Sequence, residues 1–177
     1  IGEFATHVTG SVGAGAGQPQ PRIDLAALRQ QCHQLCAVAT LYEEAATLRQ
    51  IELGASFRWL AEVWQGQTNH QYAVLARLAP PAVVGSLSGH LLHPGLLDAC
   101  FQVAPLAQAP GTSAETLLPF AIEQFHLYRP ALGNSWWCYA LQVAPYQWNI
   151  QLLDGQGNII AAINGFQMRA ASPAAVY

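Results

Sequence analysis

The chain contains no lysine, and all seven of its basic residues are scattered arginines. Only 10% of its 177 residues are charged, and the net charge is −3. Such a surface lacks the basic patch that attracts nucleic acid or an anionic membrane. Although 52% of the residues are hydrophobic, no apolar stretch approaches the roughly 20 residues of a membrane-spanning helix. We therefore expect no nucleic acid and no membrane as partner, and interpret the apolar excess as core or buried interface.

Cofactor signatures are also lacking. There is no Walker loop, and no Gly-x-Gly-x-x-Gly segment follows a predicted strand, so nucleotide and nicotinamide cofactors are not expected. Cys32 and Cys36 flank His33, but the second ligand pair of a zinc site is missing. We expect no metal, and free thiols in a reducing cytoplasm. No signal peptide is visible, and the chain starts at Ile1 with its only methionine at Met168, so we expect a piece of a longer cytoplasmic protein.

Periodicity and turn residues predict an α+β domain with more strands than helices. Asp24 is placed to cap a first helix, and Thr40 with Glu43 has the spacing of a capping box for a second. The predicted helices run over residues 25–36, 41–50 and 94–106. The predicted strands run over residues 57–64, 71–78, 117–128, 136–143, 146–153 and 159–169. One apolar helix with several long antiparallel strands after it indicates a curved antiparallel sheet wrapped around a central helix.

Asp98 is the residue that most directly suggests chemistry. It is a single carboxylate in an apolar helical run, and such an acid is costly unless it is hydrogen-bonded or has a function. Gln102 lies one turn further on the same helix face and can orient it. The alternative is a structural acid in the first turn that interacts with backbone N–H groups. The spacing alone leaves the two interpretations about even.

Several blocks resemble, in order, the C-terminal half of the dehydratase (DH) domain of modular type I polyketide synthases. The segment from Leu92 to Gln102 resembles the family's His-Pro-x-x-Leu-Asp-x-x-x-Gln segment, and Leu117-Leu118-Pro119-Phe120 resembles the strand that follows it. Leu53-Gly54-Ala55-Ser56-Phe57 resembles an upstream Tyr-Gly-Pro-x-Phe motif, with leucine in place of tyrosine and alanine in place of proline. The resemblance covers about residues 22–170.

The resemblance implies one half of a double hot-dog fold. Residues 1–12 would be the last strand of a preceding, missing N-terminal hot dog, and residues 13–21 a flexible linker. Residues 22–170 would form the C-terminal hot dog, and residues 171–177 a tail. The family's catalytic histidine lies in the other half, and nothing in this chain matches its motif. We therefore expect the chain alone to be inactive and to expose the apolar surface that its partner half covers.

The implied reaction removes water from a β-hydroxyacyl thioester on an acyl carrier protein and gives an α,β-unsaturated thioester. The resemblance makes Asp98 the general acid, with Gln102, His93 and Pro94 in support; His93, before Pro94, is interpreted as a structural residue at the helix entrance. The expected substrate-binding residues are Leu53, Gly54, Phe57, Leu97, Leu118, Pro119 and Phe120. No cofactor is expected, because the phosphopantetheine arm belongs to the carrier protein. The expected partners are that carrier protein, the N-terminal half and, in a homodimer, a second copy.

Two other functions remain open at this stage. A dehydratase-like domain of the same fold can act as a cyclase, an isomerase or a product template. A non-catalytic structural or docking module of the megasynthase is the alternative from a different class. Leucine at position 53 keeps both alternatives open, because the tyrosine of the family's motif would place a hydroxyl near the substrate or the catalytic acid.

Overall fold

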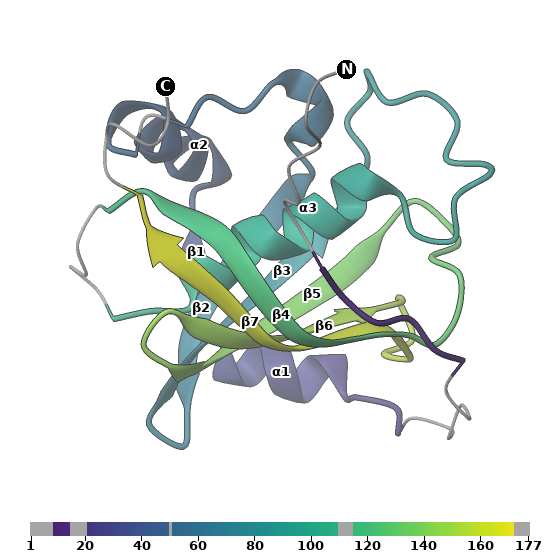
Figure 1. Cartoon of the computed structure of the whole chain (residues 1–177). Helices are drawn as coiled ribbons and strands as arrows, with labels where there is room; N and C mark the ends of the chain where they lie inside the picture. Colours follow the sequence, from purple (N-terminus) through teal and green to yellow (C-terminus); the bar gives the residue numbers. More distant parts are fainter. Residues whose placement is uncertain (1–8, 15–20, 50, 110–114, 172–177) are drawn as a thin grey trace.

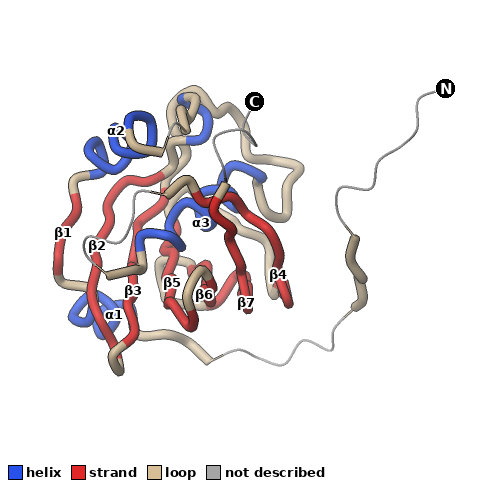
Figure 2. Tube along the Cα trace, turned by 60° about the vertical axis from the view of Figure 1, so that its left-hand side comes forward, coloured by secondary structure: helices blue, strands red, loops and turns tan. Residues whose placement is uncertain are grey.

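The computed structural model describes residues 9–14, 21–49, 51–109 and 115–171. Within these ranges one sheet of seven antiparallel strands is ordered β1-β2-β3-β5-β6-β7-β4. Helix α3 (Pro94–Val103) lies across the concave face of this sheet, and α1 (Leu25–Gln31) lies on the opposite face (Figure 1). Figure 2 shows the strands curving around α3 from β1 at one edge to β4 at the other. This is the predicted hot-dog fold.

Tight turns connect the long strands. The strands are β1 (Gln34–Cys36), β2 (Leu60–Thr68), β3 (Gln71–Leu78), β4 (Leu117–Leu127), β5 (Trp136–Ala144), β6 (Gln147–Leu153) and β7 (Ile159–Ala170). Asn69 and His70 both have positive φ between β2 and β3, as a two-residue hairpin turn requires. Between β6 and β7, Asp154 accepts from the backbone N–H groups of Gln156 and Asn158, both at 2.9 Å. Gly157 follows at φ +82°, which glycine adopts without strain.

Helix α3 begins where the sequence predicts. His93 is its N-cap residue, and His93 Nδ1 accepts a hydrogen bond of 3.0 Å from the backbone N–H of Gly95. Pro94 occupies the first helical position, where the missing N–H costs nothing. Beyond Val103 the chain tightens into a 3₁₀ turn, η2 (Ala104–Leu106). The predicted helix over residues 94–106 therefore exists as an α-helix with a 3₁₀ end.

The start of α3 packs closely on Trp59, the residue before β2. Trp59 is fully buried, its ring lies 5.1 Å from that of His93, and its Nε1 donates to the carbonyl of Ser56 at 2.8 Å. A Cβ at Gly95 would lie only 2.6 Å from Trp59 Nε1. A side chain therefore does not fit at Gly95 without displacing the helix from the sheet. This contact sets the distance between α3 and the concave face of the sheet, and so the distance between Asp98 and that face.

Helix α1 covers a second apolar cluster on the convex face. Asp24 caps it, with Oδ1 accepting from Ala26 N at 2.8 Å, as the sequence predicts. Leu28 and Cys32 pack with Trp64 and Leu75 in this cluster. The helix was predicted to run to about residue 36, and that is wrong. It ends at Gln31, because the next residues turn and pair with β2 as the three-residue strand β1.

Two further boundaries differ from the prediction. Helix α2 runs over Val38–Thr47, so the predicted cap at Thr40 is wrong: Ala37 is the N-cap residue and makes no side-chain cap bond. The first hairpin strand begins at Leu60, because Ala55–Phe57 forms the 3₁₀ turn η1. Residues 9–14 contain neither helix nor strand. The predicted strand over residues 1–12 lies mostly outside the described residues, and so does the predicted linker over residues 13–21, so both stay predictions.

Candidate active site

Asp98 lies one turn inside α3 and is half-buried. No acidic residue occupies the first turn of this helix. The free N–H groups of a helix are those of its first turn, so the structural interpretation of Asp98 as a first-turn acid does not fit. Its recorded hydrogen bond is instead to a side chain, that of Gln102.

Gln102 links the carboxylate to the segment before β2. Its Nε2 donates to Asp98 Oδ2 at 2.7 Å and to the backbone carbonyl of Phe57 at 2.9 Å. Both acceptors require the amide nitrogen, so the orientation of the amide is determined by its partners. The i, i+4 bond expected from the sequence is therefore present. Gln102 also ties α3 to η1, directly after Leu53 and Gly54.

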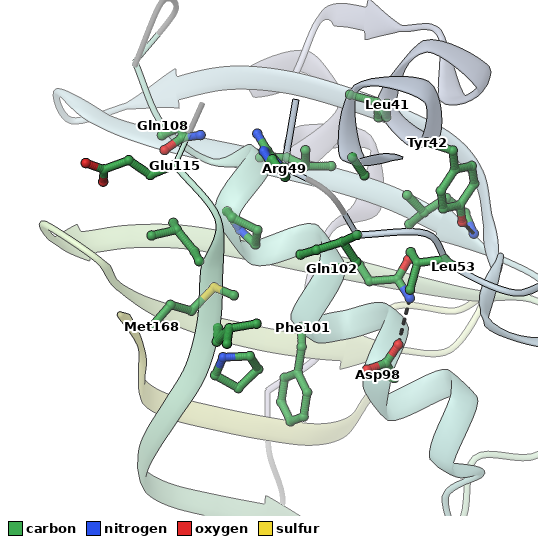
Figure 3. Close-up of a pocket in the computed structure, with 18 residues that line it drawn as sticks. Leu41, Tyr42, Arg49, Leu53, Asp98, Phe101, Gln102, Gln108, Glu115 and Met168 are labelled. Carbon is green, nitrogen blue, oxygen red and sulfur yellow. Dashed lines mark hydrogen bonds between the residues drawn. The ribbon is translucent and has the colours of Figure 1, made fainter. Parts of the chain in front are cut away.

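A cavity of about 210 Å³ opens beside this pair (Figure 3). Asp98, Phe101 and Gln102 contribute its α3 wall, while α2 and the segment around Leu53 cover it. Leu117, Leu118 and Pro119 from β4 and Met168 from β7 complete the wall. Asp98, Gln102, Leu53 and Tyr42 lie toward one end in Figure 3, and Gln108 and Glu115 toward the other. The lining is mostly apolar, as in sites that bury an acyl chain.

The structure brings five of the predicted site residues to this one cavity. They are Asp98, Gln102, Leu53, Leu118 and Pro119. They come from three segments that are far apart in the sequence. Asp98 and three of the predicted substrate-binding residues therefore line the same cavity.

Other predicted substrate-binding residues lie outside this cavity. The Phe57 side chain is exposed, and its contribution is the backbone carbonyl that holds Gln102. Phe120 is also exposed, and the Arg169 guanidinium stacks on it at 3.2 Å from the ring centroid. Leu97 packs against the core, and Gly54 precedes η1. Their contact with substrate stays a prediction.

The sequence reasoning missed the contribution of α2. Leu41, Tyr42 and Ala45 lie on one face of this helix and line the cavity, and Arg49 follows just beyond it. The i, i+1, i+4 spacing was a visible signal of a shared helix face. It did not reveal that this face lines the same cavity as Asp98, because that depends on packing between segments about 55 residues apart in the sequence.

Burial makes the thiols poor nucleophiles. It raises the pKa of Cys32 to about 11 and, together with the neighbouring Cys100 thiol, the pKa of Cys138 well above its usual value. In the described part of the chain no three His, Cys, Asp or Glu residues are arranged to hold a metal ion. None of the helices in the described ranges has the length and apolar character needed to cross a membrane.

The arrangement suits proton transfer to a group on an apolar chain. An oriented carboxyl at the wall of a cavity can give a proton to an oxygen held beside it. A single acid performs one half of an elimination, and the other half requires a base. Fold and site together define a hot-dog domain whose central helix presents one carboxylic acid to an apolar cavity.

Comparison with known proteins assigns this domain to a family. The family described as "Polyketide synthase dehydratase N-terminal domain" matches residues 20–176. Polyketide synthase PksN of Bacillus subtilis is 29% identical over 173 residues, which are 92% of this chain and 3% of that protein. Polyketide synthase ThaG of Burkholderia thailandensis is 33% identical over 120 residues, 67% of this chain and 2% of ThaG. The chain belongs to the polyketide synthase dehydratase family.

Solved structures give the same result for the fold. A dehydratase from the CurK module, in an inactive mutant, superposes with a TM-score of 0.80 at 27% identity. The alignment covers 89% of this chain and 55% of that one. The dehydratase domain of the CurJ module of the curacin polyketide synthase gives a TM-score of 0.74 at 32% identity, with 88% and 57% covered. The chain thus spans about half of these solved domains.

Proposed function

We propose that this chain is the acid-bearing, C-terminal hot dog of a polyketide synthase dehydratase domain. Its substrate is a β-hydroxyacyl thioester on an acyl carrier protein, and its product is the α,β-unsaturated thioester. The observation that carries the proposal is Asp98, held by Gln102 at the wall of an apolar cavity. The catalytic histidine comes from a second hot dog.

The proposed reaction balances with one acid and one base. The base removes the proton on the α-carbon, and the electrons of that C–H bond form the Cα=Cβ double bond. The Cβ–O bond breaks, and Asp98 gives its proton to the departing oxygen, which leaves as water. Hydroxide leaves poorly, so protonation during bond cleavage lowers the barrier. Of the CurK dehydratase, both an aspartate-to-asparagine and a histidine-to-phenylalanine variant are described as inactive.

Strand β4 supports the need for a second hot dog. Within the described residues it lies at an edge of the sheet, and its one pairing partner there is β7. Its exposed apolar side chains are Leu118, Phe120, Ile122, Phe125 and Leu127. An exposed apolar edge strand is a template for pairing with another chain or domain. The solved relatives are about 1.5 to 1.6 times as long as this chain, which leaves room for such a unit.

The test is an Asp98→Asn substitution in the intact domain, assayed with a β-hydroxyacyl thioester on its carrier protein. Asparagine keeps the shape of the side chain but cannot donate an acidic proton, so we expect turnover to fall about 10²- to 10⁴-fold. Asp24→Asn is the matched control, because asparagine caps α1 as well as aspartate does. Turnover that survives in Asp98→Asn would exclude the acid role. A cyclic or isomerised product made by the wild type would favour the cyclase or isomerase alternatives. A wild type that makes no product would favour a docking module.

A further inference from the structure

Tyr42 is the cavity residue that the proposed reaction leaves without a task. It lies on α2, and its ring forms part of the cavity wall at the end that holds Asp98, Gln102 and Leu53 (Figure 3). Among the described residues that line the cavity, Tyr42 alone carries a hydroxyl group. Leu53, which stands where the family's motif has tyrosine, offers none.

The hydroxyl group of Tyr42 accepts one hydrogen bond and still has its own proton to donate. Tyr42 Oη accepts a hydrogen bond of 3.1 Å from the backbone N–H of Leu60, at the start of β2. Within the described ranges, no acceptor is recorded for its own O–H proton. A phenol can accept and donate at the same time, so the bond from Leu60 leaves the donor available. A half-buried donor without an acceptor is uncommon in native proteins.

The ring is held in place from a second direction. The Arg58 guanidinium lies 5.5 Å from the centroid of the Tyr42 ring, and Arg58 Nε donates to the carbonyl of Leu53 at 2.9 Å. Tyr42 is thus fixed between Leu60 and Arg58, and it is tied through Arg58 to the Leu53 segment. A donor fixed in this way is preorganised, which is the property that makes hydrogen bonds effective in a site.

The phenol keeps its proton at neutral pH. Burial raises the pKa of Tyr42; the Leu60 hydrogen bond and the Arg58 charge act in the opposite direction, and the Asp98 charge raises it further. Tyr42 and Asp98 line the same end of the cavity (Figure 3). The two groups therefore bring two different proton donors to one end of the cavity.

We propose that the Tyr42 phenol donates a hydrogen bond to the β-hydroxyl oxygen of the substrate, next to the proton that Asp98 delivers. This inference rests on the function proposed above. A hydroxyl oxygen has two lone pairs, so it can accept from Tyr42 and from Asp98 together. As the Cβ–O bond breaks, negative charge grows on this oxygen, and the bond from Tyr42 strengthens. Tyr42 thereby holds the hydroxyl against the acid and stabilises its departure.

The test compares the loss of the phenol with the loss of the substrate hydroxyl. The wild-type domain and its Tyr42→Phe variant are prepared intact. Calorimetry then measures the binding of two substrate analogues, in each of which an acyl chain is joined to the phosphopantetheine arm by an amide. One amide carries a β-hydroxyacyl chain and the other the same chain without the hydroxyl. An amide replaces the thioester because its α-proton is too weakly acidic for elimination. We expect Tyr42→Phe to weaken binding of the hydroxylated amide about 3- to 10-fold and to leave the deoxy amide within twofold.

Two controls separate this role from a structural one. Tyr139→Phe makes the same chemical change in the convex-face cluster, and we expect no change with either ligand. Equal weakening of both amides by Tyr42→Phe would overturn the proposal, because a structural defect does not distinguish the two ligands. If Tyr42→Phe fails to fold, the wild type still decides: an equal affinity for both amides would overturn the proposal. A wild-type domain that does not dehydrate the thioester would refute the proposed function, whatever the amides show.

Discussion

Gln102 combines a well-determined orientation with an unsatisfied atom. Both hydrogen bonds use its Nε2, so Oε1 points away from them, and within the described part of the chain it is buried without a partner. A buried acceptor of this kind costs about 1–3 kcal/mol. Orientation of the Asp98 carboxyl thus opposes local stability, as is common at functional sites.

Because of His93, we expect the stability of the start of α3 to depend on pH. Burial and the neighbouring His90 lower the pKa of His93, which keeps the lone pair on Nδ1 that accepts from Gly95. A histidine whose folded pKa lies below the unfolded value of about 6.5 stabilises the fold above that pH. Its contribution is lost as the pH falls through the lowered value. We expect the urea midpoint to decrease below about pH 6.5, and to decrease less in His93→Asn, because asparagine caps a helix without titrating. Identical pH profiles for the two proteins would refute this.

At the residue scale, local chemistry predicts some of the site. The Asp98–Gln102 bond follows from i, i+4 geometry, and the His93 and Asp24 caps follow from their positions before helices. Tyr42 could not be predicted in this way. Its place at the Asp98 end of the cavity depends on how α2 packs against β2, and no local pattern encodes that contact.

Among the elements, α3 depends on Gly95. We expect Gly95→Ala to destabilise the fold by about 1–3 kcal/mol, because the added Cβ overlaps the Trp59 indole and displaces the helix. Urea unfolding measures the change. The matched control is Gly85→Ala, where a Cβ meets nothing within 4 Å, and there we expect a change within about 0.5 kcal/mol. Equal stability of the two variants would show that the contact between α3 and Trp59 is not tight.

The long strands and α3 could be predicted because each has a strong period and clear turn residues. Strand β1 could not, because three residues carry no period, and it exists only through its pairing with β2. The start of α2 was misplaced for a related reason. Contacts of α2 with β2 decide where that helix begins, and they override the side-chain cap that Thr40 offered.

At the scale of the whole molecule, the edge strand β4 predicts association. We expect this chain alone to form dimers or larger species, since its exposed apolar residues have no cover within the described structure. Ile122→Lys should shift sedimentation velocity toward monomer. Leu132→Lys is the control, because Leu132 is 78% exposed but lies in a loop away from β4. A wild-type chain that sediments as a monomer at high concentration would contradict the expectation.

The global arrangement was predicted further by resemblance than by periodicity. A helix and antiparallel strands define the layers, but not the strand order that puts β4 at the edge beside β7. That order brings Leu118 and Pro119 to the cavity that holds Asp98. It depends on long-range pairing, for which the sequence offers no local signal.

Helix α2 closes the cavity with side chains that are at most partly buried, such as Val38, Leu41 and Tyr42. It is held by the Leu60–Tyr42 hydrogen bond, and the segment after it by the bond from Thr116 Oγ1 to the carbonyl of Arg49. An element with so little buried surface opens locally at a far lower free energy than the sheet beneath it. The cavity therefore has a rigid floor and a roof that is fixed at Tyr42 and more compliant elsewhere. Under the proposed function, we expect bulkier acyl chains to be accommodated by that compliant part of the roof. Redesign of chain-length tolerance should begin on α2 and leave the strands untouched.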